Sequence, residues 1–298
     1  MNAQEIASAI AQQHGHMLAG EPQNLAQAPS VNALTPEMAG VLQGCRMLGF
    51  LEHDAQCVMQ AWQQQSQRLG GFDVSAWPVH PSDFGIAPAP RNHAFAPCPH
   101  ALGLYAVLPD AQWVGRMARA GVPTVQLRFK SDDAAAIARE VHAAVAAVQD
   151  TQALLFINDH WQAAIDAGAY GVHLGQEDMA DAPLQTIRAA GLRLGLSTHG
   201  YAEMLRADAV SPSYIALGAV FPTTLKRMAT APQGMGRLQA YARLMQQHPL
   251  VAIGGIDASR LGAVLQTGVG SVAMVRAITD ADQPEATAKG FMKIMNAS

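Results

Sequence analysis

Residues 102–130 read LGLYAVLPDAQWVGRMARAGVPTVQLRFK, and this stretch decides the fold. The apolar run at residues 104–108 has the length of a buried strand, and residues 112–120 have the spacing of an amphipathic helix. A second apolar run follows at residues 124–127. Strands that alternate with helices in this way are typical of parallel sheets.

The alternation continues to the end of the chain. Apolar runs lie at residues 104–108, 124–127, 153–157, 171–174, 193–197, 214–217, 250–253 and 271–275. Helical spacing follows at about residues 112–120, 132–149, 160–167, 183–190, 201–208, 234–247, 257–266 and 282–295. Eight such units predict a (β/α)8 TIM barrel at the small end of its usual size. A doubly wound open sheet is the alternative, but no strand–loop junction carries GxGxxG, which favours the barrel.

The first third of the chain has a different character, and we expect three parts: a helical extension at residues 1–76, a linker at 77–100 and the barrel at 101–298. Helices are expected at residues 3–13 and from Thr35, a predicted N-cap followed by a proline. A further helix is expected at residues 54–69, before two glycines. Residues 77–100 hold six prolines without a clear period, which indicates an extended linker.

Composition limits the class of protein. Half of the 298 residues are hydrophobic, only 14% are charged, and the net charge is −4. A disordered chain is therefore excluded, and a basic nucleic-acid-binding face is not indicated. No apolar run has the length of a membrane span, and the N-terminus does not resemble a secretory signal. The chain has three cysteines, which indicates reduced thiols and a cytoplasmic protein.

Polar side chains follow the apolar runs, and in a TIM barrel the catalytic residues lie at these carboxyl ends of the strands. Gln126, Arg128 and Lys130 alternate at the end of the second run and should share one side. Two cations and an amide suit a phosphate group. The alternative is an exposed basic strand end paired with Asp132 or Asp133.

Carboxylates follow the third and fourth runs. Asp159 and Asp178 would face the basic cluster, and a divalent ion between them would reconcile the opposite charges. Mg²⁺ binds through one or two carboxylates and completes its shell with phosphates and water. We therefore predict these two residues as metal ligands, with Asn158 and Gln126 touching the organic substrate. The alternatives are an N-cap role for Asp159 and a turn role for Asp178.

Two further segments indicate anion contacts. The fifth run ends in Ser197, whose hydroxyl could hold a phosphate oxygen or cap the next helix. His199 nearby is an equally open candidate, whereas His173 inside a strand is expected to be a core histidine. The loop at residues 218–233 is long enough to suggest a functional lid. It carries the candidate substrate contacts Thr223, Thr224, Leu225 and Lys226.

A second phosphate site is expected after the seventh and eighth runs. Gly255 lets the backbone approach an anion closely, and Val275 and Arg276 follow the last run. Loops at these two positions frequently form the phosphate site of a barrel. A tight turn is the alternative for the glycines. The first site would suit a diphosphate and the second a monophosphate.

The order of motifs resembles the thiamine phosphate synthase (thiamine-phosphate pyrophosphorylase) family over about residues 102–278. The segments that carry the resemblance are QLRFK, INDHW, YGVHLGQED, LGLSTH, ALGAVFPTTLK, APQG, VAIGGI and VGSVAMVRAI. The resemblance implies a TIM barrel that joins a pyrimidine diphosphate to a thiazole phosphate, giving thiamine phosphate and pyrophosphate. It implies a dissociative mechanism in which Mg²⁺ assists the departure of diphosphate.

The resemblance also implies roles for single residues. Gln126, Arg128 and Lys130 would hold the pyrimidine diphosphate, and Asn158 the pyrimidine. Asp159 and Asp178 would bind Mg²⁺. Ser197 and Lys226 would contact the diphosphate. Gly255, Val275 and Arg276 would lie at the thiazole phosphate.

Two departures from the family pattern stand out. Leu225 replaces a threonine in the TxTK pattern, with Thr224 one place earlier, and Arg276 replaces a serine. Contacts made through the backbone would tolerate both changes, and Arg276 could add a phosphate contact.

Alternatives to coupling are a barrel that isomerises a thiazole phosphate and a non-catalytic ligand-binding barrel. The partners are expected to be small-molecule substrates, with neither nucleic acid nor membrane, and a homo-oligomer is possible. Residues 1–97 lie outside the resemblance and are expected to pack on the barrel or on a second subunit. A metal site there from His14, His16, Cys45, His53 and Cys57 lacks a regular spacing.

Overall fold

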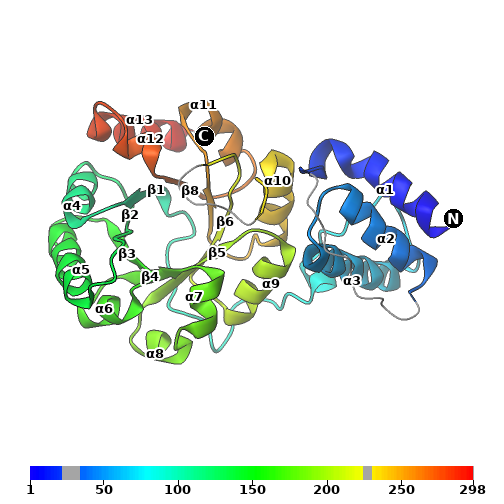
Figure 1. Cartoon of the computed structure of the whole chain (residues 1–298), viewed down its shortest axis with the longest axis horizontal. Helices are drawn as coiled ribbons and strands as arrows, with labels where there is room; N and C mark the ends of the chain where they lie inside the picture. Colours follow the sequence, from blue (N-terminus) through cyan, green and yellow to red (C-terminus); the bar gives the residue numbers. More distant parts are fainter. Residues whose placement is uncertain (22–33, 224–229, 298) are drawn as a thin grey trace.

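A closed barrel of eight parallel strands, paired in sequence order, forms the body of the molecule (Figure 1). The computed structural model describes residues 1–21, 34–223 and 230–297. The strands are β1 (Gly103–Leu108), β2 (Thr124–Leu127), β3 (Leu154–Asn158), β4 (Gly171–Leu174), β5 (Arg193–Thr198), β6 (Tyr214–Leu217), β7 (Leu250–Ile253) and β8 (Ser271–Met274). The predicted (β/α)8 barrel is confirmed, and the strand ends differ from the predicted ones by at most one residue.

Helices surround the barrel in the predicted order. They are α4 (Ala111–Arg119), α5 (Ala134–Val148), α6 (Trp161–Asp166), α7 (Gln176–Asp181), α8 (Leu184–Ala189), α9 (Tyr201–Val210), α10 (Gly234–Leu244), α11 (Ala258–Leu265), α12 (Arg276–Thr279) and α13 (Pro284–Ala297). Sequence reasoning missed α7 and α12, because helices of six and four residues are too short to show an amphipathic period. Both follow strand ends directly.

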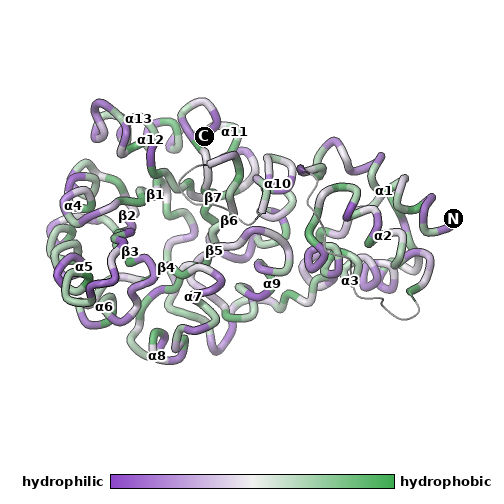
Figure 2. Tube along the Cα trace, viewed as in Figure 1, coloured by the Kyte–Doolittle hydropathy of each residue, from purple (hydrophilic) through white to green (hydrophobic). Residues whose placement is uncertain are grey.

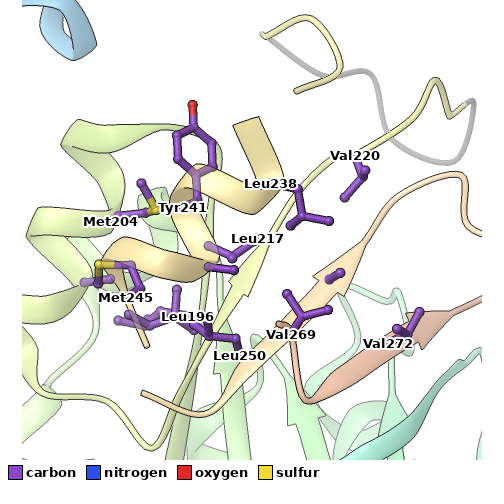
Figure 3. Close-up of a cluster of buried hydrophobic side chains, with 14 of the residues drawn as sticks. Leu196, Met204, Leu217, Val220, Leu238, Tyr241, Met245, Leu250, Val269 and Val272 are labelled. Carbon is purple, nitrogen blue, oxygen red and sulfur yellow. The ribbon is translucent and has the colours of Figure 1, made fainter. Parts of the chain in front are cut away.

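Alternation along the strands separates two hydrophobic clusters. In β1, Tyr105 and Val107 join a cluster inside the barrel, whereas Leu104 and Leu108 belong to the layer between strands and helices. Figure 3 shows part of that outer layer, where side chains of β5, β6 and β7 meet those of α9 and α10. The labelled residues from these elements are Leu196, Met204, Leu217, Leu238, Tyr241 and Leu250. This packing fixes α9 and α10 relative to the strand ends.

The N-terminal extension forms three helices that lie beside the barrel, next to α9 and α10 (Figure 1). They are α1 (Ala3–Leu18), α2 (Pro36–Met47) and α3 (Glu52–Leu69). Thr35 caps α2 as predicted, accepting a hydrogen bond from Met38 N. Gly70 ends α3 in the left-handed conformation (φ 80°), which glycine adopts without strain. Helix α1 runs five residues beyond the predicted end.

The stretch at residues 77–100 is irregular apart from one 3-10 turn, Pro81–Phe84, but it packs closely. Trp77, Phe84 and Phe95 are buried in the main hydrophobic cluster. Arg91 makes an ion pair with Asp208 near the end of α9, at 2.8 Å. The segment therefore holds the extension to the barrel rather than spacing the two apart.

Hydropathy varies along the helices that surround the barrel. Figure 2 shows hydrophilic and hydrophobic residues mixed along the helices that surround the barrel, such as α4 and α5. Among the described residues, no helix combines the length and the apolar character that a bilayer span requires.

Candidate active site

A cavity of about 550 Å³ opens at the carboxyl ends of the strands. Its walls come from the strands β1 to β8 and from the loops after β2 to β8, so residues far apart in sequence meet there. The volume lies in the range of small-molecule sites, and the carboxyl end is where barrels place their chemistry. Of the candidate residues, those lining the cavity are Gln126, Arg128, Asn158, Asp159, Asp178, Ser197, Thr223, Gly255, Val275 and Arg276.

The end of β2 supplies an amide and a cation. Gln126 is buried and lines the cavity, and its Nε2 has no hydrogen-bond partner among the described residues. Arg128 also lines the cavity, whereas Lys130 is exposed and lies outside the lining. The described ranges contain no ion pair between these cations and Asp132 or Asp133. Asp133 instead caps α5 through Ala135 N at 2.9 Å.

The end of β3 turns sharply at Asp159. Its φ of 61° lies in the left-handed region, where Asp is one of the few non-glycine residues found with any frequency. Asp159 N donates to His173 O of β4 at 3.0 Å, which holds the turn against the neighbouring strand. The side chain does not cap α6, which begins at Trp161 without a side-chain cap. Asn158 Nδ2 donates to Asp159 Oδ2. The backbone thus directs a carboxylate into the cavity.

A second carboxylate faces the first. Asp178 is the third residue of α7 and lines the same cavity. The pocket walls partly desolvate Asp159 although it reaches solvent, and this raises its pKa. The negative charge of Asp178 raises this pKa further, while His160 and Arg128 oppose the rise. Two carboxylates that repel each other beside an arginine are an arrangement that a divalent cation and a phosphate would neutralise.

The described residues do not supply a complete metal cage. They contain no group of three or more His, Cys, Asp or Glu side chains placed to hold a metal ion, at this cavity or in the N-terminal extension. A cation here would take its other ligands from substrate and water, as Mg²⁺ commonly does. Thus Asp159 and Asp178 fit Mg²⁺ better than a metal that requires several protein ligands.

A chain of hydrogen bonds leads from the cavity into the barrel interior. Ser197 Oγ lies 2.8 Å from His173 Nε2, and His173 Nδ1 lies 2.7 Å from the hydroxyl of Tyr214. That hydroxyl lies 2.7 Å from the hydroxyl of Tyr105. Burial raises the pKa of both phenols well above the usual value, so both stay neutral near pH 7. The chain fixes the orientation of Ser197 toward the cavity.

The two residues after Ser197, Thr198 and His199, make hydrogen bonds within the protein. Thr198 Oγ1 is buried and donates to Ala216 O of β6 at 2.9 Å. The His199 ring lies 2.6 Å from Glu203 Oε2, which also accepts from His199 N at 2.9 Å. Burial would raise the pKa of Glu203, but the hydrogen bonds and charge of His199 outweigh it and lower the pKa. His199 lines the cavity with its ring held by this pair.

We call Arg128, Asp159, Asp178 and Ser197 the charged rim, because side chains dominate it. Across the cavity, Gly254, Gly255, Val275 and Arg276 form what we call the glycine rim. Gly254 and Gly255 have φ values of 107° and 64°, which side-chain-bearing residues rarely adopt.

The backbone after β6 packs closely on the glycine rim. Phe221 N donates to Gly254 O at 3.0 Å, and a Cβ on Gly255 would come within 2.6 Å of Pro222 O. The close fit explains why glycine is required here, beyond the tight turn considered from the sequence. Thr224, Leu225 and Lys226 lie outside the described residues, whereas Thr223 lines the cavity.

Among the lining residues that were not assigned from the sequence, His173 and Arg260 carry the hydrogen-bonding groups of most interest. His173 was expected to be a core histidine, but it reaches both the barrel interior and the cavity. The sequence holds no signal for this role, because the pairing of His173 with Asn158 across β4 and β3 is a feature of the fold. Arg260 of α11 lines the glycine side, donates to Gly255 O and stacks on Phe221, with 4.5 Å between guanidinium and ring centroid. Its position in the first turn after the glycines was the available signal.

Known proteins resemble the barrel part of the chain. The family described as thiamine monophosphate synthase matches residues 104–278. The thiamine-phosphate synthase of Neisseria meningitidis serogroup B is 56% identical over 200 residues, covering 67% of this chain and 98% of that protein. The thiamine-phosphate synthase of Escherichia coli O6:H1 is 52% identical over 187 residues, covering 63% and 89%. A solved thiamine phosphate pyrophosphorylase from Pyrococcus furiosus superposes with a TM-score of 0.59 at 27% identity, covering 66% and 96%.

Proposed function

The chain belongs to the thiamine monophosphate synthase family and makes thiamine phosphate, and from this premise we propose how its cavity carries out the reaction. The substrates are 4-amino-2-methyl-5-(diphosphooxymethyl)pyrimidine and 4-methyl-5-(2-phosphooxyethyl)thiazole, and pyrophosphate is the second product. In the proposed mechanism, the bond from the pyrimidine methylene to the diphosphate breaks first. The aminopyrimidine stabilises the cation that remains, and the thiazole nitrogen then forms the new bond to the methylene.

One observation carries the proposal: a single cavity is lined by the charged rim, after β2 to β5, and by the glycine rim, after β7 and β8, in different arcs of the closed barrel. A diphosphate at the charged rim and a monophosphate at the glycine rim would bring the two rings together between them. Fixed orientation of two reactants replaces a collision in solution and can supply several kcal/mol of the barrier. The isomerising and non-catalytic alternatives give the charged rim no task, and the curated relatives above 50% identity are synthases.

Asp159 and Asp178 would hold Mg²⁺ in this proposal. The raised pKa of Asp159, caused first by desolvation and then by the charge of Asp178, supports a cation-binding role. Bound Mg²⁺ would supply neutralisation of the negative charge that develops on the departing diphosphate.

The chain's own groups would bind and orient the substrates. Arg128 lies beside the two carboxylates and is placed to bind diphosphate oxygens, and Ser197, oriented by His173, would donate to another. Asn158 and the unpaired Nε2 of Gln126 would fix the pyrimidine ring. Lys130 at the rim, and Thr223, Thr224, Leu225 and Lys226 after β6, remain proposed substrate contacts.

The glycine rim would bind the thiazole phosphate. Backbone N–H groups near Gly255 and Val275, which line the cavity after β7 and β8, would bind its anion. Arg276, exposed at the start of α12, would add a charged contact.

Pyrophosphate release tests the proposal. The protein is mixed with both substrates and magnesium, and released pyrophosphate is measured for the parent and for Asp159→Ala. Asp181→Ala is the matched control, since Asp181 is exposed on α7 outside the cavity lining. We expect release by the parent and the control, and its loss in Asp159→Ala. No release by the parent would contradict the reaction, and full release by Asp159→Ala would contradict the metal site.

Three wider expectations stay proposals. The unpaired state of Cys45, Cys57 and Cys98 supports work in a reducing, cytoplasmic compartment. Catalysis is assigned to residues 101–298, because the family match lies within them, with 1–76 as an extension and 77–100 as its connection. Assembly into a homo-oligomer is proposed without assigning a surface.

A further inference from the structure

The N-terminal extension contacts the barrel at two helices that follow lining strands of the active site. Helix α3 packs against α9, and α1 packs against α10. Figure 1 shows the extension beside these two helices, away from α4, α5 and α6. Helix α9 follows Ser197 and His199, and α10 follows the loop that supports the glycine rim. The extension is therefore attached where it can influence both rims.

Asp54 of α3 caps the barrel helix α9. The N-cap position of α9 is Gly200, which has no side chain to satisfy the first N–H groups. Asp54 Oδ1 accepts from Ala202 N at 2.9 Å and supplies that cap from another part of the chain. Gly200 leaves the space for it, because a Cβ there would lie 2.2 Å from Asp54 Oδ2. The first turn of α9 also carries Glu203, which holds His199 at the charged-rim side of the cavity.

Arg237 of α10 makes the second connection. It is 3% exposed, so its guanidinium requires acceptors within the protein. Nε donates to Leu18 O at 3.0 Å and Nη2 to Leu48 O at 2.7 Å. These carbonyls end α1 and α2, where the helix dipoles favour a cation. The guanidinium also lies 4.0 Å from the ring centroid of Phe50. Its principal partners all belong to the extension.

From Arg237, contacts lead to the glycine rim through Gln233. Gln233 Oε1 accepts from Tyr241 Oη at 3.1 Å and lies 3.4 Å from Arg237 Nη1. Its backbone N donates to Ala219 O at 2.8 Å, and the next residue donates to Val220 O at 2.9 Å. Val220 N in turn donates to Ile253 O at 2.9 Å, directly before the two glycines. The backbone that packs on the glycine rim is thus held from the extension side.

We propose that the extension is a positioning element of the active site: Asp54 positions the charged rim through α9, and Arg237 positions the glycine rim through Gln233. The assignment of one substrate to each rim rests on the proposed function. Neither residue touches substrate, so both act through the backbone that carries the contacts. The extension is then required for the geometry of the site as well as for the stability of the chain.

Two variants of the full-length protein test whether Asp54 and Arg237 each affect the binding of a different substrate. In Asp54→Ala, we expect the KM for the pyrimidine diphosphate to rise on the order of tenfold, because small displacements of positioned groups cost rate and binding. The KM for the thiazole phosphate should stay at the parent value. In Arg237→Met, we expect the KM for the thiazole phosphate to rise by a similar factor and the KM for the pyrimidine diphosphate to stay at the parent value. Both constants are measured by pyrophosphate release with the other substrate saturating.

Further variants separate positioning from stability. Asp54→Asn keeps an acceptor for Ala202 N and should restore the diphosphate KM. Arg91→Met is the matched control for Arg237, because Arg91 also joins the N-terminal segment to the barrel but does so at Asp208, near the far end of α9. It should lower the melting temperature and leave both KM values unchanged. If Arg237→Met does not fold, Gly236→Ala replaces it, since its Cβ would lie 1.9 Å from Met17 O and push α1 away.

The outcomes are distinct. The positioning role is overturned if both KM values stay unchanged in Asp54→Ala and in Arg237→Met. It is also overturned if either variant raises the KM for both substrates together, or if Arg91→Met shows the same change. If the parent protein releases pyrophosphate and the variants behave like the parent, the positioning role fails but the proposed function stands. If the parent protein releases no pyrophosphate, the proposed function itself is wrong.

Discussion

The two sides of the active-site cavity offer different groups to phosphate. The charged rim consists of side chains at or shortly after the carboxyl ends of β2 to β5: an arginine, two aspartates and a serine. The glycine rim consists mainly of backbone around Gly254 and Gly255, held by the segment after β6. A site made of side chains loses function when atoms are removed, whereas a site made of backbone loses function when atoms are added.

Magnesium removal should produce the largest difference between the rims. Without a cation, the diphosphate would meet two carboxylates, of which Asp159 already has its pKa raised by desolvation and then by the charge of Asp178. We expect chelation to lower turnover on the order of a thousandfold, because a metal contributes several kcal/mol of charge stabilisation. Isothermal titration should show weakened binding of the pyrimidine diphosphate and unchanged binding of the thiazole phosphate. Equal loss for both ligands would contradict the separation of the rims.

Arg128→Ala is expected to be the next most severe change. Removing one preorganised donor from a developing negative charge costs about 10²–10³ in rate. The loss should appear in kcat/KM for the pyrimidine diphosphate, measured by pyrophosphate release. Arg139→Ala, an exposed change on α5 outside the cavity, is the control. A variant that loses activity toward the thiazole phosphate alone would place Arg128 on the wrong rim.

The charged rim could be predicted from the sequence because charge at the end of an apolar strand is conspicuous. Asp159 and Asp178 were expected at the mouth of the barrel, and both line the cavity. His173 is buried and hydrogen-bonded, as expected of a core histidine, but a histidine within a strand gives no sign that it will also line the cavity. The close approach of Pro222 to Gly255 could not be predicted either, because it depends on the path of two loops in space.

Gly255→Ala should weaken the glycine rim alone. The new Cβ would lie 2.6 Å from Pro222 O and 2.8 Å from Phe221 Cβ, at a φ of 64°. We expect the KM for the thiazole phosphate to rise about tenfold, since displacing the loop disturbs the anion site, and the diphosphate KM to stay unchanged. Gly268→Ala is the matched control, because its φ of 93° is equally unusual but nothing lies within 4 Å. Similar KM changes in both variants would show that strain, not the anion site, is responsible.

The barrel and the extension also differ in what their sequences disclose. Apolar runs such as residues 250–253 (LVAI) predicted strand bounds that the structure reproduces, because a parallel strand buried on both faces is apolar throughout. Helix α2 was equally clear from Thr35 and Pro36. The contact of Asp54 with α9 joins residues 148 positions apart, and no local pattern signals it. Local physics thus predicts elements, while contacts between them emerge only in three dimensions.

Arg276→Ser is expected to have the smallest effect, and it tests whether the glycine rim is truly built from backbone. Arg276 is exposed at the start of α12, so a phosphate contact there would be screened by water. Exposed ion pairs contribute about 0.2–1 kcal/mol, which corresponds to less than about a fivefold rise in the KM for the thiazole phosphate. An unchanged KM would reject a phosphate contact by Arg276 and leave recognition to the backbone near Gly255 and Val275. A rise well beyond fivefold would instead mean that a side chain dominates this rim too, and the contrast between the two sides of the cavity would fail.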